Sequence, residues 1–159
     1  MIKLKKKLQV FAFTGILILA FTSCASYRLE KKLSPEDSEW LSEVRYIITP
    51  EERKIFLEMP ESERKQFKED FWKRRDPDPD TEENEYKDEY YKRMEQANRL
   101  FQGEGRPGWL TDRGRIYIVF GPPTERQTFP MEARGYCREV WYYGSFPVIF
   151  VDENCSGNY

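Results

Sequence analysis

The sequence has no histidine, and its mean hydropathy is only −0.81 over 159 residues. Without imidazole there is no Ser-His-Asp or Cys-His nucleophile system, no histidine-ligated zinc and no imidazole pH switch. A charged fraction of 34% with low hydropathy is typical of disordered chains, but an aromatic fraction of 16% is not. The aromatic residues therefore predict a folded domain, and carboxylates are the main catalytic groups that remain.

The chain also lacks a hydrophobic run long enough to span a bilayer. Four lysines at positions 3, 5, 6 and 7 precede an apolar run at residues 8–21. A membrane-spanning helix needs about 20 apolar residues. A short apolar run after a basic start is instead the pattern of a secretory signal peptide. We therefore expect an exported protein.

The apolar run ends in the sequence Phe-Thr-Ser-Cys at residues 21–24, which resembles a bacterial lipobox, although leucine is more usual than Phe21. The resemblance implies that Cys24 is acylated and becomes the mature N-terminus, anchored in a membrane by its acyl chains. Residues 1–23 are then a lipoprotein signal peptide and residues 24–33 a spacer. Ordinary secretion and an uncleaved anchor remain alternatives. Ala25 rather than aspartate implies the outer membrane, facing the periplasm, if the host is Gram-negative.

Loss of residues 1–23 would remove four lysines and no acidic residue from a chain whose formal net charge is already −2. An acidic mature domain argues against nucleic acid, which binds basic surfaces. Two cysteines remain, Cys137 and Cys155, and in an exported protein such a pair favours a disulfide over a metal site. Two free buried thiols are the alternative. We expect no cofactor and no bound metal.

Helix signals fill the first part of the mature chain, at about residues 34–102. Ser34 and Thr49 each precede a proline, as helix caps do, and another helix start lies near Pro60. The Asp-Pro run at residues 76–80 must end that helix. We expect Asp80, in a capping box with Glu83, to start the next helix. That helix has the strongest periodicity in the chain, with apolar positions at Tyr86, Tyr90, Met94, Ala97 and Phe101.

After the glycines at residues 103–108 the apolar period changes from 3.6 to 2. Residues 115–120, 139–143 and 148–151 then read as strands. The loops between them are too short for crossover helices, which favours antiparallel pairing. Helices followed by strands predict an α+β fold, with N-terminal helices packed on a small antiparallel β-sheet. We expect one domain over residues 34–159, with its strands at about 109–152.

The pentapeptide Gly108-Trp109-Leu110-Thr111-Asp112 resembles the motif that names the GWxTD-domain proteins of bacteria. Residues 71–77, 84–101 and 112–123 are similar to that family's aromatic-basic segment, long helix and strand entry. The resemblance covers about residues 55–152. It implies an exported, often lipid-anchored protein, and it implies a fold but no activity, because the family has no established one.

Two roles compete for the motif residues. In the structural role, Gly108 permits a sharp turn, Trp109 is an apolar anchor, and Thr111 with Asp112 begins a turn that joins helices to sheet. Asp112 could also pair with a nearby arginine. In the catalytic role, Asp112 converges with Asp76 and Glu85 as a carboxylate pair acting on an envelope polysaccharide.

Two further hypotheses concern binding. Alternating acids at Asp76, Asp78 and Asp80 could ligate Ca²⁺, although the prolines between them do not fit an EF-hand loop. Aromatic residues in excess of one small core could form a surface for a protein partner: Tyr91, Tyr136, Tyr142, Tyr143 and Phe146. We expect a lipid-anchored cell-envelope protein that acts as a non-catalytic interaction or assembly module for another, unknown envelope protein, with a carboxylate-dependent hydrolase as the alternative.

Overall fold

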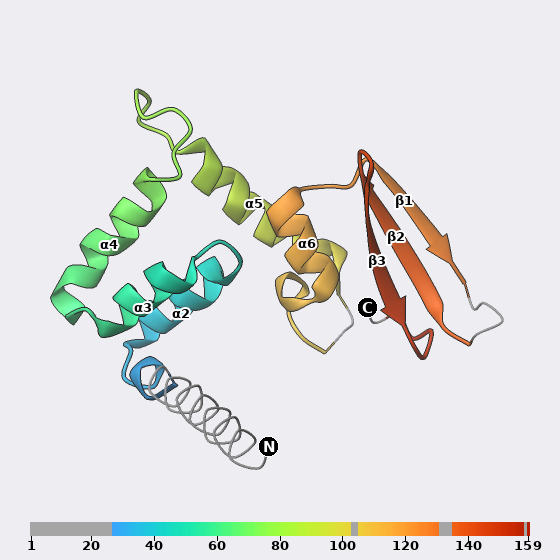
Figure 1. Ribbon diagram of the computed structural model, residues 1–159, viewed down its shortest axis with the longest axis horizontal. Helices are drawn as coiled ribbons and strands as arrows, with labels where there is room; N and C mark the ends of the chain where they lie inside the picture. The colour runs from blue at the N-terminus through green and yellow to red at the C-terminus, as the bar shows by residue number, and fades with distance from the viewer. Residues whose placement is uncertain (1–26, 103–104, 131–134, 158) are drawn as a thin grey trace, which may run out of the picture. The chain divides into compact units, whose positions relative to one another are not determined.

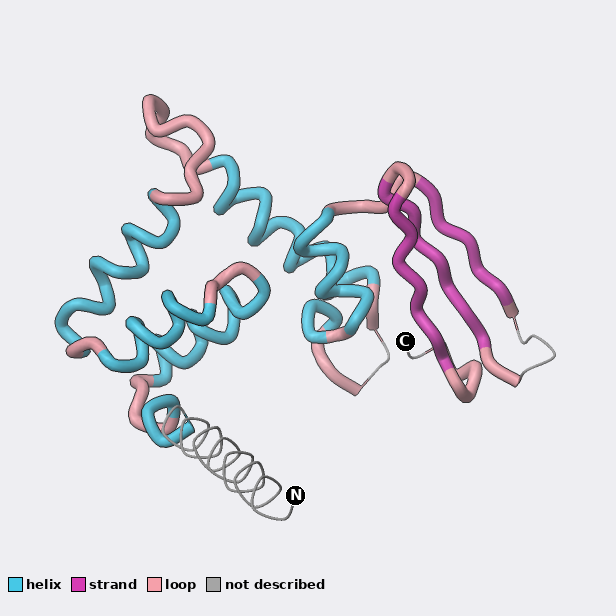
Figure 2. Tube along the Cα trace, viewed as in Figure 1, coloured by secondary structure: helices cyan, strands magenta, loops and turns pink. Residues whose placement is uncertain are grey.

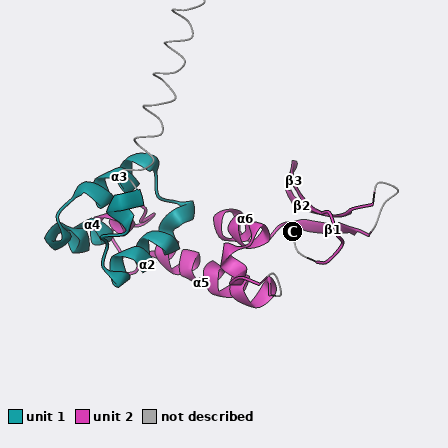
Figure 3. Cartoon of the chain, turned by 90° about the horizontal axis from the view of Figure 1, so that it is seen from below, with its two compact units in different colours: residues 1–69 teal, residues 70–159 magenta. Residues whose placement is uncertain are grey.

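The computed structural model describes residues 27–102, 105–130, 135–157 and 159, which form a series of helices followed by a three-stranded sheet (Figure 1). The α+β class expected from the sequence is confirmed. The chain divides into two compact units, residues 1–69 and residues 70–159 (Figure 3). Cys24 and the predicted signal peptide lie outside the described residues.

The first unit contains α2 (Pro35–Glu43), the 3₁₀ helix η1 (Val44–Tyr46), α3 (Pro50–Glu58) and most of α4 (Glu61–Lys73). The caps are those that the sequence predicts. The Ser34 hydroxyl accepts a hydrogen bond from the Asp37 amide at 3.2 Å. Thr49 and Glu52 form a reciprocal capping box. Local sequence signals therefore fix where α2 and α3 begin.

The core of the first unit combines aromatic rings with a buried ion cluster. Trp40 packs on Phe56 with ring centroids 4.8 Å apart. Beside them, the buried Asp37 carboxylate contacts the Arg64 guanidinium at 3.0 Å and the Lys68 ammonium at 2.7 Å. Burial alone would raise the pKa of Asp37, but hydrogen bonds from Lys68, Arg64 and the N-cap serine outweigh it and hold that pKa below its usual value. The cluster joins α2 to α4.

The second unit begins in the last residues of α4 and continues with α5 (Glu85–Leu100). Asn84, and not Asp80, caps α5: its side-chain oxygen accepts from the Lys87 amide at 2.9 Å. The prediction that Asp80 caps this helix was wrong because Asp80 belongs to a turn in the preceding loop. In that turn the Asp78 carboxylate accepts a hydrogen bond from the Asp80 amide at 3.3 Å. The Asn84 side chain also donates to the Trp72 carbonyl at 2.8 Å, which ties α5 to the end of α4.

Residues 115–120, expected to form a strand, belong instead to the helix α6 (Asp112–Phe120). Short apolar runs suit both structures, and here the helix ends decide. Thr111 caps the N-terminus, and Gly121 ends the helix with φ of 81°, a conformation that favours glycine. Buried Gly114, Tyr117 and Ile118 follow helical spacing. The 3₁₀ helix η2 (Gly108–Leu110) precedes α6, so the expected strands over 109–124 are absent from the described residues there.

The sheet has the order β1 (Glu125–Phe129), β2 (Cys137–Tyr143) and β3 (Phe146–Asp152), with both pairs antiparallel (Figure 2). The strands expected at 139–143 and 148–151 are confirmed as parts of β2 and β3. The strand β1 was not predicted, because its residues are mostly polar and lack an apolar alternation. Backbone pairing with β2, rather than side-chain burial, holds this edge strand in place.

Helices α5 and α6 pack on one face of this sheet through aromatic rings. The Trp141 side chain of β2 is fully buried. Its ring centroid lies 5.5 Å from that of Phe101, 6.5 Å from that of Tyr117 and 4.9 Å from that of Phe150. This face of the sheet is the core of the second unit, and the opposite face is left to solvent or to a partner.

Candidate functional site

Gly108 of the pentapeptide allows a close approach between η2 and α5. A Cβ atom at this position would lie 2.2 Å from the Ala97 carbonyl oxygen and 2.9 Å from the Asn98 Cα. Its backbone is not in the left-handed region. The glycine is therefore required because the helices touch here, and not for the sharp turn that the sequence suggested. The Trp109 amide adds a hydrogen bond to the Asn98 side chain at 3.1 Å.

Thr111 is the central residue of the motif and is fully buried. Its hydroxyl donates to the Gly108 carbonyl at 2.8 Å and accepts from the Gly114 amide at 2.9 Å. A Cβ on Gly114 would lie 2.0 Å from that same carbonyl oxygen. One hydroxyl thus caps α6 and fixes η2 against it, and the motif acts as a clasp between η2, α5 and α6.

Asp112 is the first residue of α6, and 60% of its side chain is exposed. Residues 111–114 are the first turn of this helix rather than the turn expected from the sequence. The nearest cation to the carboxylate is the Arg115 guanidinium at 3.8 Å, a surface pair that contributes little to stability. Its position at a helix N-terminus suits a negative charge because of the helix dipole.

The structure does not bring the three candidate catalytic carboxylates together. Glu85 is the first residue of α5, whereas the motif that carries Asp112 packs on Ala97, twelve residues along the same helix. At about 1.5 Å per residue these two points are about 18 Å apart. Asp76 accepts a hydrogen bond from the Asp78 amide at 3.1 Å in the loop before α5. A carboxylate pair for acid–base hydrolysis needs about 5–10 Å.

The alternating aspartates proposed as calcium ligands serve the loop itself. Asp76 and Asp78 each accept a hydrogen bond from the amide two residues later, which is the geometry of an Asx turn. Among the residues that the structure describes, no group of three or more acidic or cysteine side chains is arranged to hold a metal ion.

The most buried charged cluster was not foreseen from the sequence. The Glu139 side chain on β2 is 1% exposed, and it accepts hydrogen bonds from the Trp141 ring nitrogen and from Arg113 at 3.4 Å. The Arg126 guanidinium forms an ion pair with the same carboxylate. Arg113 also lies over the Phe101 ring at 5.4 Å. One signal was available: Glu139 alternates with Trp141 on the inward face of β2, where a lone carboxylate needs partners.

The C-terminal residues fold back onto this cluster. A disulfide joins Cys137 to Cys155 with Cα atoms 5.1 Å apart. The Asp152 carboxylate accepts from the Asn154 amide at 3.1 Å and the Gly157 amide at 2.6 Å. Burial would raise the pKa of Asp152, but these amide hydrogen bonds lower it. The Gly157 carbonyl in turn accepts from Arg113 at 2.9 Å.

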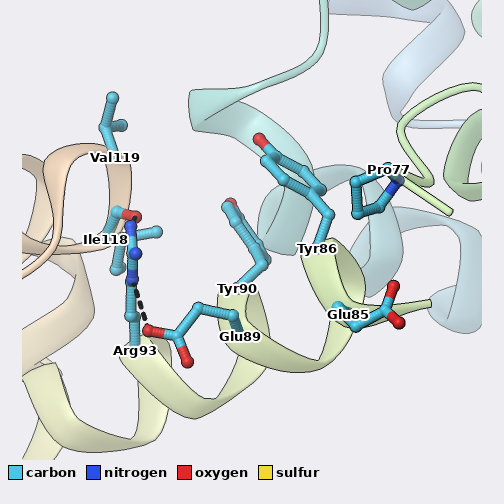
Figure 4. Close-up of a pocket in the computed structure, with 8 residues that line it drawn as sticks. All are labelled: Pro77, Glu85, Tyr86, Glu89, Tyr90, Arg93, Ile118 and Val119. Carbon is cyan, nitrogen blue, oxygen red and sulfur yellow. Dashed lines mark hydrogen bonds and ion pairs between the residues drawn. The ribbon is translucent and has the colours of Figure 1, made fainter. Parts of the chain in front are cut away.

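A groove of about 350 Å³, here called the α5–α6 groove, lies between α5 and the end of α6 (Figure 4). Its apolar walls come from Pro77, Tyr86, Tyr90, Ile118 and Val119, and its polar walls from Glu85, Glu89 and Arg93.

The polar end of the α5–α6 groove is fixed by Arg93. Its Nε donates to the Glu89 carboxylate at 2.9 Å, and its Nη1 donates to the Ile118 carbonyl at 3.3 Å. The hydrogen bond from Arg93 lowers the pKa of Glu89. The arginine therefore holds α5 against α6, and of the two tyrosines that line the groove Tyr86 is exposed and Tyr90 is buried.

The face of the sheet turned away from α5 and α6 is called here the outer face. Cross-strand register defines it as three rows of side chains: Phe129–Arg138–Val151, Gln127–Val140–Ile149 and Glu125–Tyr142–Pro147. Ile149 is 55% exposed and Val151 is 49% exposed. The guanidinium of Arg138 lies 5.0 Å from the Phe129 ring centroid. Ile149 and Val151 are thus exposed on the outer face, whereas Val140 on the central strand is buried.

The comparison with protein families agrees with the geometry of the clasp. The family model for the GWxTD domain matches residues 32–148. The chain belongs to the GWxTD domain family. No curated protein and no solved structure matches it. The matched range begins well before the residues that carry the resemblance in the sequence, so the GWxTD domain here includes the helices of the first unit.

Within the GWxTD domain, the four specified residues of the motif differ in burial. Gly108 and Thr111 are buried in the clasp, whereas Asp112 is exposed and Trp109 is half-buried. Of the five surplus aromatic residues, only Phe146 is exposed, at 56%, and the other four are half-buried. No helix in the described part of the chain is long and apolar enough to span a membrane.

Proposed function

We propose that this chain is a lipid-anchored protein of the bacterial cell envelope whose GWxTD domain binds another protein and catalyses no reaction. The observation that carries the proposal is the outer face of the sheet. Contiguous exposed apolar side chains on a folded domain mark interaction sites, because association removes this apolar surface from water, which is favourable. Ile149 and Val151, both on the edge strand β3, form the exposed apolar part of this surface.

The clasp supports a role as a rigid platform. Thr111 and the two glycines at 108 and 114 are fully used in packing η2 and α6 against α5. The hydrolase alternative requires a second carboxylate within reach of Asp112, and the wide spacing of Asp112 from Glu85 along α5 speaks against it. A rigid helix–sheet unit that presents an apolar strand face suits recognition of a protein.

The membrane anchor rests on residues 1–24 of the sequence, with Cys24 as the acylated residue. In a Gram-negative host the proposed location is the outer membrane, with the domain in the periplasm. Cys24→Ser in a related host should abolish acyl labelling and release the protein from the membrane fraction. Membrane association that survives the substitution would show that residues 8–21 anchor the chain without acylation.

Site-specific photocrosslinking in intact cells tests the binding role. A photoreactive phenylalanine analogue replaces Ile149 on the outer face or, as a control, Ile55 on α3, since both side chains are about half exposed. We expect a discrete covalent adduct with one protein from position 149 and none from position 55. Equal yields at the two positions, or no adduct from position 149, would contradict the proposal.

A further inference from the structure

The walls of the α5–α6 groove suit a long side chain with a charged end. Tyr86 and Tyr90 lie one helical turn apart on α5, with Tyr86 39% exposed and Tyr90 buried. Ile118 and Val119 line the α6 side. Apolar and aromatic walls accept the methylene stem of lysine or arginine, and tyrosine rings attract the cation. The volume of about 350 Å³ lies at the small end of the range for ligand pockets, about 300–1,000 Å³.

The charges around the α5–α6 groove select a cation. Residues 76–89 contain a single basic residue, Lys87, and eight acidic ones: Asp76, Asp78, Asp80, Glu82, Glu83, Glu85, Asp88 and Glu89. Two of these, Glu85 and Glu89, line the groove together with Pro77 from the same segment. The electrostatic potential of the groove beside Pro77, Glu85 and Glu89 is therefore negative, and it would repel a carboxylate or phosphate.

The basic residue in the wall does not reverse that charge. Arg93 is held by Glu89 and by the Ile118 carbonyl, and its guanidinium lies against the backbone at Gly121. Glu89 also pairs with Lys92 at 3.3 Å on the helix surface. Glu85 contacts only the Thr81 hydroxyl, at 3.4 Å, among the bonds of the described chain. Its carboxylate thus retains capacity for a cation.

We propose that the α5–α6 groove binds a lysine or arginine side chain of a partner protein. The methylene stem lies against Tyr86 and Val119, and the charged end is directed to Glu85 and Glu89. The inference rests on the proposed function as a protein-binding module and names the chemistry of a second contact, separate from the outer face of the sheet.

Fluorescence anisotropy with the full chain in detergent tests this inference. The probe is a fluorescent octapeptide that alternates glycine and lysine, and the comparison peptide has glutamate at each lysine. We expect the lysine peptide alone to bind. Equal binding of the glutamate peptide would overturn the charge argument. Binding of a fluorescent chitin oligosaccharide together with no binding of the lysine peptide would assign the groove to sugars and overturn the proposal.

Two matched variants separate the groove from general negative charge. Glu89→Gln and Glu95→Gln each remove a carboxylate that pairs with an arginine four residues later on α5, but only Glu89 lines the groove. We expect Glu89→Gln to weaken peptide binding about threefold and Glu95→Gln to leave it nearly unchanged. Equal losses would show that the peptide senses net charge alone.

The aromatic wall has its own variants. Tyr86→Ala should weaken binding of the lysine peptide about fivefold, and Tyr86→Phe should restore it, because the ring and not the hydroxyl contacts the stem. No loss with Tyr86→Ala would overturn the proposal. The outcomes remain separable from the test of function: an adduct at position 149 without peptide binding refutes the groove alone, and peptide binding without that adduct refutes the role of the outer face.

Discussion

The two units of the chain each bury one carboxylate between basic side chains, but they do so in different settings. In the first unit, Asp37 on α2 meets Arg64 and Lys68 of α4, and every member comes from a helix. In the second unit, Glu139 on β2 meets Arg113 of α6 and Arg126 of β1. The first cluster joins helix to helix, whereas the second joins helix to sheet.

The two clusters differ in the other contacts of their basic side chains and in how deeply the carboxylate is buried. Lys68 would still have Glu36 at 3.2 Å, a mostly exposed partner. Besides Glu139, Arg113 contacts the Gly157 carbonyl and the aromatic rings of Phe101 and Tyr159. Glu139, with 1% of its side chain exposed against 7% for Asp37, is the more deeply buried carboxylate, and a disulfide closes the chain beside it.

Glu139→Ala should lower the free energy of unfolding of the second unit by about 4 kcal/mol, because a buried guanidinium loses its counter-charge. Urea unfolding followed by the fluorescence of Trp141, which lies in the same cluster, provides the measurement. Glu125→Ala, at an exposed position of β1, is the control and should change stability by less than about 0.5 kcal/mol. Similar urea midpoints for Glu139→Ala and Glu125→Ala would contradict the claim that the cluster around Glu139 stabilises the second unit.

Loss of the disulfide between Cys137 and Cys155 should cost about 3 kcal/mol, since the bridge closes a loop with a sequence separation of 18 residues. The double substitution to serine, compared with the wild type in urea, measures this cost. The transition of the second unit should move and that of the first unit should not. A shift of both transitions together would show that the two units unfold as one.

Asp37→Asn should destabilise the first unit by about 2 kcal/mol, less than the change at Glu139, because Lys68 keeps Glu36 as a partner. Circular dichroism at 222 nm during urea unfolding reports on these helices. Asp112→Asn is a matched control, since it removes the same charge from an exposed first turn of a helix. A larger loss from Asp37→Asn than from Glu139→Ala would reverse the contrast between the units.

The smallest effect concerns pH. The folded-state pKa of Asp37 lies below its unfolded value of about 3.9, so the folded state binds fewer protons there. The stability that Asp37 contributes is present above about pH 4 and is lost as the pH falls through the lower, folded-state pKa. Asp152 and Glu89, whose pKa values are also lowered, titrate in the same acid range. The difference in stability between wild type and Asp37→Asn therefore isolates Asp37, and it should shrink on acidification. A difference that stays constant down to pH 2 would contradict the assignment.

Local chemistry explains what the sequence could predict of the fold. Ser34 and Thr49 were correctly identified as caps because a cap depends on its own next three residues. The stripe on α5 was evident because the periodicity persists over sixteen residues. The failures came where context decides. An apolar run of strand-forming residues became α6, because Thr111 caps it and Gly108 leaves room for it against α5.

The candidate site was harder to predict than the fold because it depends on pairs far apart in the chain. Glu139 and Arg113 are separated by 26 positions, and nothing in either local sequence indicates the other. The outer face required β1, whose polar residues pair with β2 through the backbone. Asp112 carried the strongest functional expectation, and it lies in solvent while its neighbour Thr111 forms the clasp.

The central claim is that the outer face of the sheet binds a protein, and the photocrosslink from position 149 tests it most directly when combined with Val151→Asp. Val151 is a neighbour on the same face and is half exposed, so the substitution should leave the fold intact. We expect the adduct to form in the wild-type background, to disappear with Val151→Asp and to persist with Ile55→Asp on α3. An adduct that forms equally in all three backgrounds would contradict it.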